Sequence, residues 1–188
     1  MELVRNFLAE VVPHVDFNPD GDKDDLVETL LVVGAVNWYR TPVHTALVAI
    51  ARWLDGGEFP TNLVEEALEW VRERKSALLR EYPKVLVALA EKYRNEAPLL
   101  SAALSTLAEA LEGGVDQQAA VEAQRAAVEA IEGWYGLAAF ASEGEAARRG
   151  LERGYLRGVV FNSLGPLYNL EIGLSAARRL LPTDVRGV

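Results

Sequence analysis

The sequence contains no cysteine, which excludes disulfides, cysteine-ligated zinc, iron–sulfur clusters and thiol nucleophiles. It also has no run of eighteen apolar residues, and its longest apolar run, residues 30–36, is too short to span a bilayer. Residues 1–5 lack the basic start and the apolar segment of a secretory signal. We therefore expect a cytoplasmic protein that does not insert into a membrane.

Several enzyme signatures are missing as well. The chain has no Gly-x-Ser-x-Gly nucleophile motif, no phosphate-binding loop and no dinucleotide-binding fingerprint. Neither of its two histidines lies three residues after a glutamate, the spacing that a di-iron carboxylate bundle uses. These absences favour a non-catalytic role and imply no certain cofactor.

The composition is that of a folded domain. Hydrophobic residues make up 50% of the 188 positions, with four Trp, six Tyr and five Phe. A chain of this size can bury a core without covalent cross-links, so we expect one domain over residues 1–188. Methionine is scarce, which is typical of thermophilic proteins. Arginine outnumbers lysine by fifteen to four, a bias that a GC-rich genome also produces.

The net charge of −9 is unevenly distributed. Residues 1–30 contain two basic and eight acidic residues, a net charge of −6, whereas residues 146–188 contain seven basic and three acidic residues, a net charge of +4. A globally acidic protein is poorly suited to coating phosphates, so nucleic acid is not an expected partner. The opposite charges predict that the two ends meet, within one molecule or between subunits.

Apolar residues recur at helical spacing along nearly the whole chain, and no alternating strand pattern is present. Prolines, glycines and capping residues divide this pattern into segments. The expected helices span residues 2–12, 24–39, 42–54, 61–81, 83–95, 98–112, 117–141, 143–161 and 166–181. We therefore expect an all-α fold, a compact bundle of about nine helices, with stacked helical hairpins as the alternative.

The most specific local pattern lies between the first two expected helices. It resembles the start of an EF-hand calcium loop, and its members are Asp16, Asn18, Asp20, Gly21, Asp22 and Asp24. The resemblance implies a calcium ion held by side-chain oxygens and by the backbone carbonyl of Asp22. Lys23 and Val27 depart from the pattern, because position eight is normally apolar and position twelve is normally a bidentate glutamate. The two interpretations are a weak structural calcium site and a solvated acidic turn in which Asp24 caps the next helix.

The helix expected over residues 143–161 has two stripes with a four-residue spacing. The first consists of small residues, Ala146, Gly150, Gly154 and Gly158. Glycine costs about 1 kcal/mol more than alanine inside a helix, so this stripe predicts close packing against another helix or a flat ligand. The second consists of Arg149, Arg153 and Arg157. Because like charges at this spacing repel, it predicts an anionic ligand, a protein partner or pairing with neighbouring acids.

Arg40 and His44 form a further candidate site. Their spacing resembles the Arg/His pair of the HEPN ribonucleases, which are also small helical bundles, although that family places four to six residues between the two and this chain places three. The alternative is that His44 belongs to the core, because residues 43–54 are apolar on nearly every side.

We therefore predict a non-catalytic helical interaction or assembly module that forms a homo-oligomer or a subunit of a complex. One alternative is a small helical enzyme or ligand-binding protein, with a site near Arg40 and His44 or an anion site on the arginine stripe. Another is weak structural calcium binding through residues 16–24.

Overall fold

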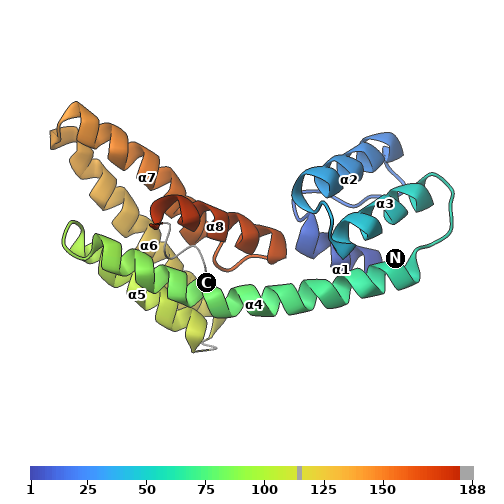
Figure 1. Ribbon diagram of the computed structural model, residues 1–188, viewed down its shortest axis with the longest axis horizontal. Helices are drawn as coiled ribbons and strands as arrows, with labels where there is room; N and C mark the ends of the chain where they lie inside the picture. The colour runs from blue at the N-terminus through green and yellow to red at the C-terminus, as the bar shows by residue number, and fades with distance from the viewer. Residues whose placement is uncertain (114–115, 183–188) are drawn as a thin grey trace. The chain divides into compact units, whose positions relative to one another are not determined.

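The computed structural model describes residues 1–113 and 116–182 and is all-helical over these residues, which confirms the predicted fold class (Figure 1). The described residues form eight α-helices and one 3₁₀ helix, with no strand. The elements are α1 (Glu2–Val11), α2 (Lys23–Asn37), α3 (Pro42–Leu54), α4 (Thr61–Tyr93), α5 (Pro98–Glu112), α6 (Gln117–Gly136), η1 (Leu137–Phe140), α7 (Glu143–Phe161) and α8 (Leu167–Leu180). In the described part of the chain, no helix combines the length and the apolar character needed to cross a membrane.

The chain divides into two compact units. Unit 1 comprises residues 1–76 and 166–168, and unit 2 comprises the described residues of 77–165 and 169–182. Helices α1, α2 and α3 therefore belong to unit 1, whereas α5, α6 and α7 belong to unit 2. The expectation of one domain over residues 1–188 is not tested by this division and stays a prediction.

Unit 1 is organised around the packing of α2 against α3. Asp22 caps α2 by accepting hydrogen bonds from the backbone N–H groups of Asp24 and Asp25, so the cap is Asp22 and not the expected Asp24. At the other end, the buried Trp38 donates a hydrogen bond from Nε1 to the Val11 carbonyl, 3.1 Å away. This bond connects the end of α2 to the end of α1.

The expected break at Pro83 does not occur. Helix α4 continues through this residue, which leaves eight α-helices in the described chain where nine were expected. A proline inside a helix removes one backbone hydrogen bond and costs about 3 kcal/mol. Fully buried side chains lie on both sides of Pro83, including Leu78, Tyr82 and Leu86. Their packing offsets the local penalty, since burying one large apolar side chain contributes roughly 1.5–3 kcal/mol.

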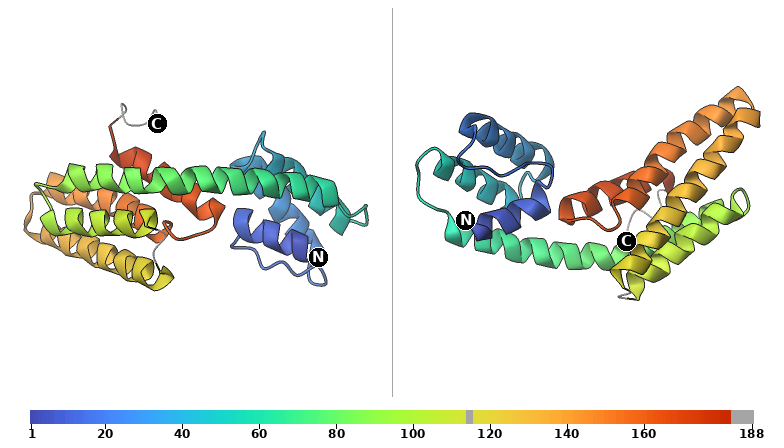
Figure 2. Two further views of the ribbon diagram at one scale, coloured as in Figure 1. Left: turned by 90° about the horizontal axis from the view of Figure 1, so that it is seen from below. Right: turned by 180° about the vertical axis from the view of Figure 1, so that it is seen from behind.

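In unit 2, α6 packs against both α5 and α7, as the two views of Figure 2 show. The glycine stripe of α7 is closely packed at one end: a β-carbon on Gly158 would lie 3.3 Å from the β-carbon of Ala176 in α8. At Gly150 the nearest atom would be 3.9 Å away, and at Gly154 no described atom lies within 4 Å. The predicted close approach therefore occurs at Gly158 and not at Gly150 or Gly154.

Candidate functional site

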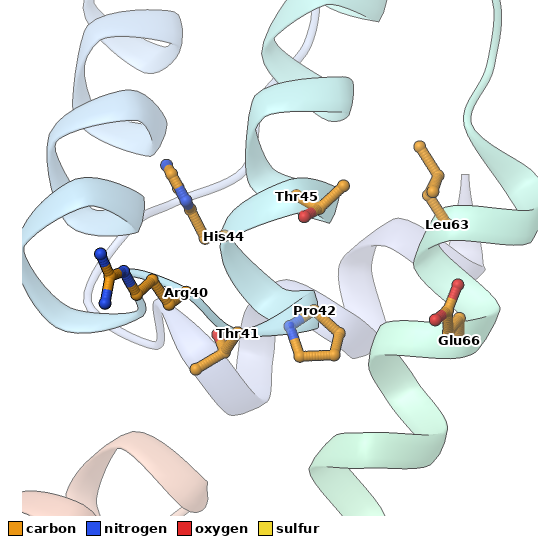
Figure 3. Close-up of a pocket in the computed structure, with 7 residues that line it drawn as sticks. All are labelled: Arg40, Thr41, Pro42, His44, Thr45, Leu63 and Glu66. Atoms are coloured by element: carbon orange, nitrogen blue, oxygen red, sulfur yellow. The ribbon is translucent and has the colours of Figure 1, made fainter.

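A cavity of about 360 Å³ opens in unit 1 at the N-terminal ends of α3 and α4 (Figure 3). Its lining residues are Arg40, Thr41, Pro42, His44, Thr45, Leu63 and Glu66. The two residues predicted from sequence, Arg40 and His44, both lie at this cavity, on the side of α2. Glu66 comes from α4 and lies across the cavity from them.

Tyr39 accounts for the placement of both predicted residues. The Arg40 guanidinium lies 5.4 Å from the centre of the Tyr39 ring, and the His44 ring lies 5.7 Å from it. His44 also lies against Gly34, because a β-carbon there would be 3.1 Å from His44 Cδ2. Arg40 has a φ of +63°, a left-handed conformation that costs of order 1 kcal/mol outside glycine. This geometry supports a packing role for His44, at the contact between α2 and α3.

The acidic loop uses its side chains for local backbone hydrogen bonds. Asn18 Oδ1 accepts from the Asp20 N–H at 3.2 Å, and Asp22 Oδ1 accepts from Asp24 and Asp25. Over the described residues, no three or more His, Cys, Asp or Glu side chains are grouped so that they could hold a metal ion. Calcium binding by the predicted ligands therefore stays a prediction; these are Asp16, Asn18, Asp20, Asp22 and Asp24.

The arginine stripe of α7 faces acids of its own unit. Arg149 Nε binds Glu145 at 2.9 Å, and Arg149 Nη1 donates to the Trp134 carbonyl at 3.0 Å. Its guanidinium also lies over the Trp134 ring, 5.4 Å from the ring centre. Glu145 thus reduces the like-charge repulsion that the stripe would otherwise produce.

The other two arginines share one carboxylate. Arg153 binds Glu132 of α6 at 2.8 Å, and Arg157 Nε lies 3.5 Å from the same side chain. Their guanidinium groups also lie over the rings of Tyr135 and Phe161, respectively. The sequence identified the basic stripe, but its acidic partner is 21 residues away from Arg153. Binding of an external anion by Arg149, Arg153 and Arg157 stays a prediction.

Arg148 lies at the centre of an ion-pair network that the sequence did not reveal. It binds Glu145 at 2.7 Å, Glu152 at 3.1 Å and Glu96. Hydrogen bonds from Arg148 and Arg149 lower the pKa of Glu145 from 4.5 to about 2. Tyr93 joins the network by donating to Glu152, and burial together with this bond raises the pKa of its hydroxyl.

The depressed pKa of Glu145 makes stability depend on pH. Between about pH 5 and pH 2, Glu145 binds a proton in the unfolded state but stays ionised in the folded state. The stabilisation from its ion pairs is therefore fully present above the unfolded-state pKa and is lost as the pH falls. We expect the melting temperature of E145Q to fall less steeply over this range than that of the parent chain. Thermal unfolding followed by circular dichroism measures both slopes. E143Q, which removes an exposed carboxylate from the same turn, is the control, and equal slopes for E145Q and E143Q would contradict the assignment.

Helix α2 exposes an apolar face that the sequence interpretation did not recognise. Its inner face buries Leu26, Leu30 and Val33. On its outer face, Val32 is 53% exposed and Val36 is 75% exposed. Tyr39, which follows two residues after the end of the helix, is 62% exposed. We define the α2 outer face as Leu31, Val32, Ala35, Val36 and Tyr39, all of them exposed. The apolar run over residues 30–36 indicates this face in the sequence. At 3.6 residues per turn, seven consecutive apolar residues surround the helix, so some of them must point away from the core.

A second apolar surface lies in unit 2. A cavity of about 340 Å³ opens between α5 and α6, and its apolar lining includes Leu99, Trp134 and Leu137. Leu99 is 83% exposed at its edge. We refer to this cavity as the α5–α6 groove. Each unit therefore presents at least one exposed apolar surface among the described residues.

Comparisons with protein-family models, with curated proteins and with solved structures gave no match.

Proposed function

We propose that the chain is a non-catalytic helical interaction and assembly module, which acts as a homo-oligomer or as a subunit of a complex. The observation that carries this proposal is the α2 outer face. Contiguous exposed apolar patches mark interaction sites, because scattered apolar residues are normal on a monomer but contiguous groups are not. Burial of a side chain such as Val36 against a partner contributes roughly 1.5–3 kcal/mol when it is complete.

The surroundings of the α2 outer face resemble those of a protein interface. Interface centres are typically depleted in charge and rich in aliphatic and aromatic side chains, with charged residues at the rim. The α2 outer face has four aliphatic residues and one tyrosine. Exposed Glu28 lies one turn before Val32, and exposed Arg40 follows Tyr39.

The other candidate sites support a structural role. The arginines of α7 are paired with Glu132 and Glu145, which lie in the same unit. His44 packs between Tyr39 and Gly34. In both arrangements, side chains that could bind a ligand or take part in catalysis instead contact neighbouring helices of the same unit.

Native mass spectrometry combined with sedimentation velocity tests the proposal. For the full chain we expect masses that are multiples of 20.6 kDa, with assembly increasing from low to high micromolar concentration. Assembly should persist at high salt, because apolar burial is not screened by ions. A mass of 20.6 kDa at every concentration would overturn the homo-oligomer and leave the subunit of a complex with other chains. A small molecule or metal ion retained in that spectrum would favour the ligand-binding alternative.

A further inference from the structure

We propose that the α2 outer face binds a second copy of this chain, with the two α2 helices antiparallel about a two-fold axis. The inference rests on the proposed function and adds the partner, the orientation and the register of pairing. The evidence is the order of apolar and charged residues along α2.

Charge is distributed asymmetrically along this helix. Its first turn is acidic, with Asp24 and Asp25, and Glu28 follows one turn later. Basic charge is found beyond the other end, at Arg40, whose guanidinium lies over the ring of Tyr39 in the α2 outer face. The α2 outer face is therefore flanked by acidic residues at one end and by a basic residue at the other.

This asymmetry selects the antiparallel pairing. Two parallel helices would place Glu28 beside Glu28 and Arg40 beside Arg40, and like charges in contact disfavour association. Two antiparallel helices place the acidic end of each copy beside the basic end of the other. The α2 helix is therefore complementary in charge to a second copy of itself, so a second copy of the chain is a sufficient partner.

A single register satisfies both the apolar and the charged residues. In a two-fold interface, if residue i contacts residue j, then j also contacts i. An axis at the level of Gly34 places Val32 opposite Val36 of the second copy. It also brings Glu28 toward the C-terminal end of the other α2, beyond which Arg40 lies. Glu28, Val32 and Val36 recur every four positions within α2, so they lie on the same side of the helix. The pairing thus joins Val36, which is 75% exposed, to an apolar partner.

The expected interface is small. Helix α2 has 15 residues and is about 22 Å long at 1.5 Å per residue. Interfaces built from one short helix per subunit lie at the lower end of the size range, so we expect a reversible dimer with dissociation in the micromolar range.

Sedimentation equilibrium of full-length variants tests this interface. V36E places an unpaired charge in its centre, and we expect the dimer dissociation constant to rise by about 100-fold or more. Because Val36 is 75% exposed, the substitution should leave the fold of the monomer unchanged. The matched control is L99E, which introduces the same charge at an exposed leucine of the α5–α6 groove in unit 2 and should leave the dimer intact.

Charge exchange tests the orientation. E28R and R40E should each weaken the dimer by about tenfold at low salt, because the two-fold axis repeats each broken pair. The double variant E28R/R40E should recover to within about threefold of the parent chain, since opposite charges again face each other.

Cysteine pairing tests the register independently, and the cysteine-free sequence provides a clean background. In the antiparallel register, a mixture of V32C and V36C chains should form an intermolecular disulfide that neither variant forms efficiently alone. Efficient cross-linking of V36C with itself would overturn this register.

The possible failures are distinguishable. If V36E leaves an assembly unchanged and L99E dissociates it, the inference is wrong and the proposed assembly function remains. If the parent chain is a monomer at every concentration, the inference is wrong and so is the homo-oligomer in the proposed function.

Discussion

Replacing Gly173 by alanine is expected to destabilise unit 2 by about 3 kcal/mol, the upper part of the usual range for overpacking. Gly173 lies in α8, and a β-carbon there would overlap the Tyr82 hydroxyl and approach the β-carbon of Asn162 to 3.1 Å. Tyr82 is fully buried and donates its hydroxyl proton to the Val159 carbonyl. Its ring therefore cannot move aside without losing that bond.

The matched control is Gly154→Ala in α7. No described atom lies within 4 Å of a β-carbon at this position. Alanine should therefore stabilise the chain by up to about 1 kcal/mol through its higher helix propensity. Chemical denaturation of the two glycine variants should give free-energy changes of opposite sign. Equal stabilities would contradict the close contact between Gly173 and Tyr82.

A double variant identifies the cause of the loss. Tyr82→Phe alone should cost about 1 kcal/mol, because the buried Val159 carbonyl loses its donor. In the Gly173→Ala background the same change should cost less or become stabilising, since it removes the atom that the new methyl group meets. A double-mutant cycle measures this coupling. Simple additivity would show that Gly173→Ala acts through something other than the hydroxyl.

Local signals predicted most of the helices. Pro42 and Pro98 each lie in the first turn of a helix, as expected for a residue that lacks an N–H group. Asp116 and Ser142 cap α6 and α7 by accepting hydrogen bonds from backbone N–H groups. Each of these effects depends on residues within one turn, so the sequence alone is sufficient to identify them.

Pro83 could not be interpreted in the same way. Its local penalty is real, but the compensation comes from distant packing: Tyr82, its neighbour, bonds to a residue 77 positions later. Intrinsic helix propensity is a weak predictor at a position where the burial of neighbouring side chains contributes more free energy. The arginines of α7 show the same limit. Their spacing is visible within one helix, but their partner Glu132 lies in another helix and could not be identified from local sequence.

The α2 outer face illustrates a different kind of omission. The apolar run over residues 30–36 is too short to span a membrane. It is longer than one turn of helix, so a neighbour on one side cannot bury all seven residues. A binding surface could have been predicted from this count, although its partner could not.

The largest loss in unit 1 is expected at Trp38. This side chain is 4% exposed, and its indole meets the Trp70 ring of α4 edge to face, with 6.3 Å between ring centres. Trp38→Ala removes this contact, leaves a cavity and removes the donor to the Val11 carbonyl. Together these changes should cost about 3–5 kcal/mol.

Two further variants separate packing from hydrogen bonding. Trp38→Phe keeps most of the ring packing but removes the donor, so its cost should fall to about 1–2 kcal/mol. Phe140→Ala, at an aromatic residue that is 89% exposed, should change stability by less than about 0.5 kcal/mol. Chemical denaturation gives the three free energies, and hydrogen exchange locates the loss within α1, α2 and α3. If Trp38→Ala resembles Phe140→Ala, Trp38 does not hold these helices together.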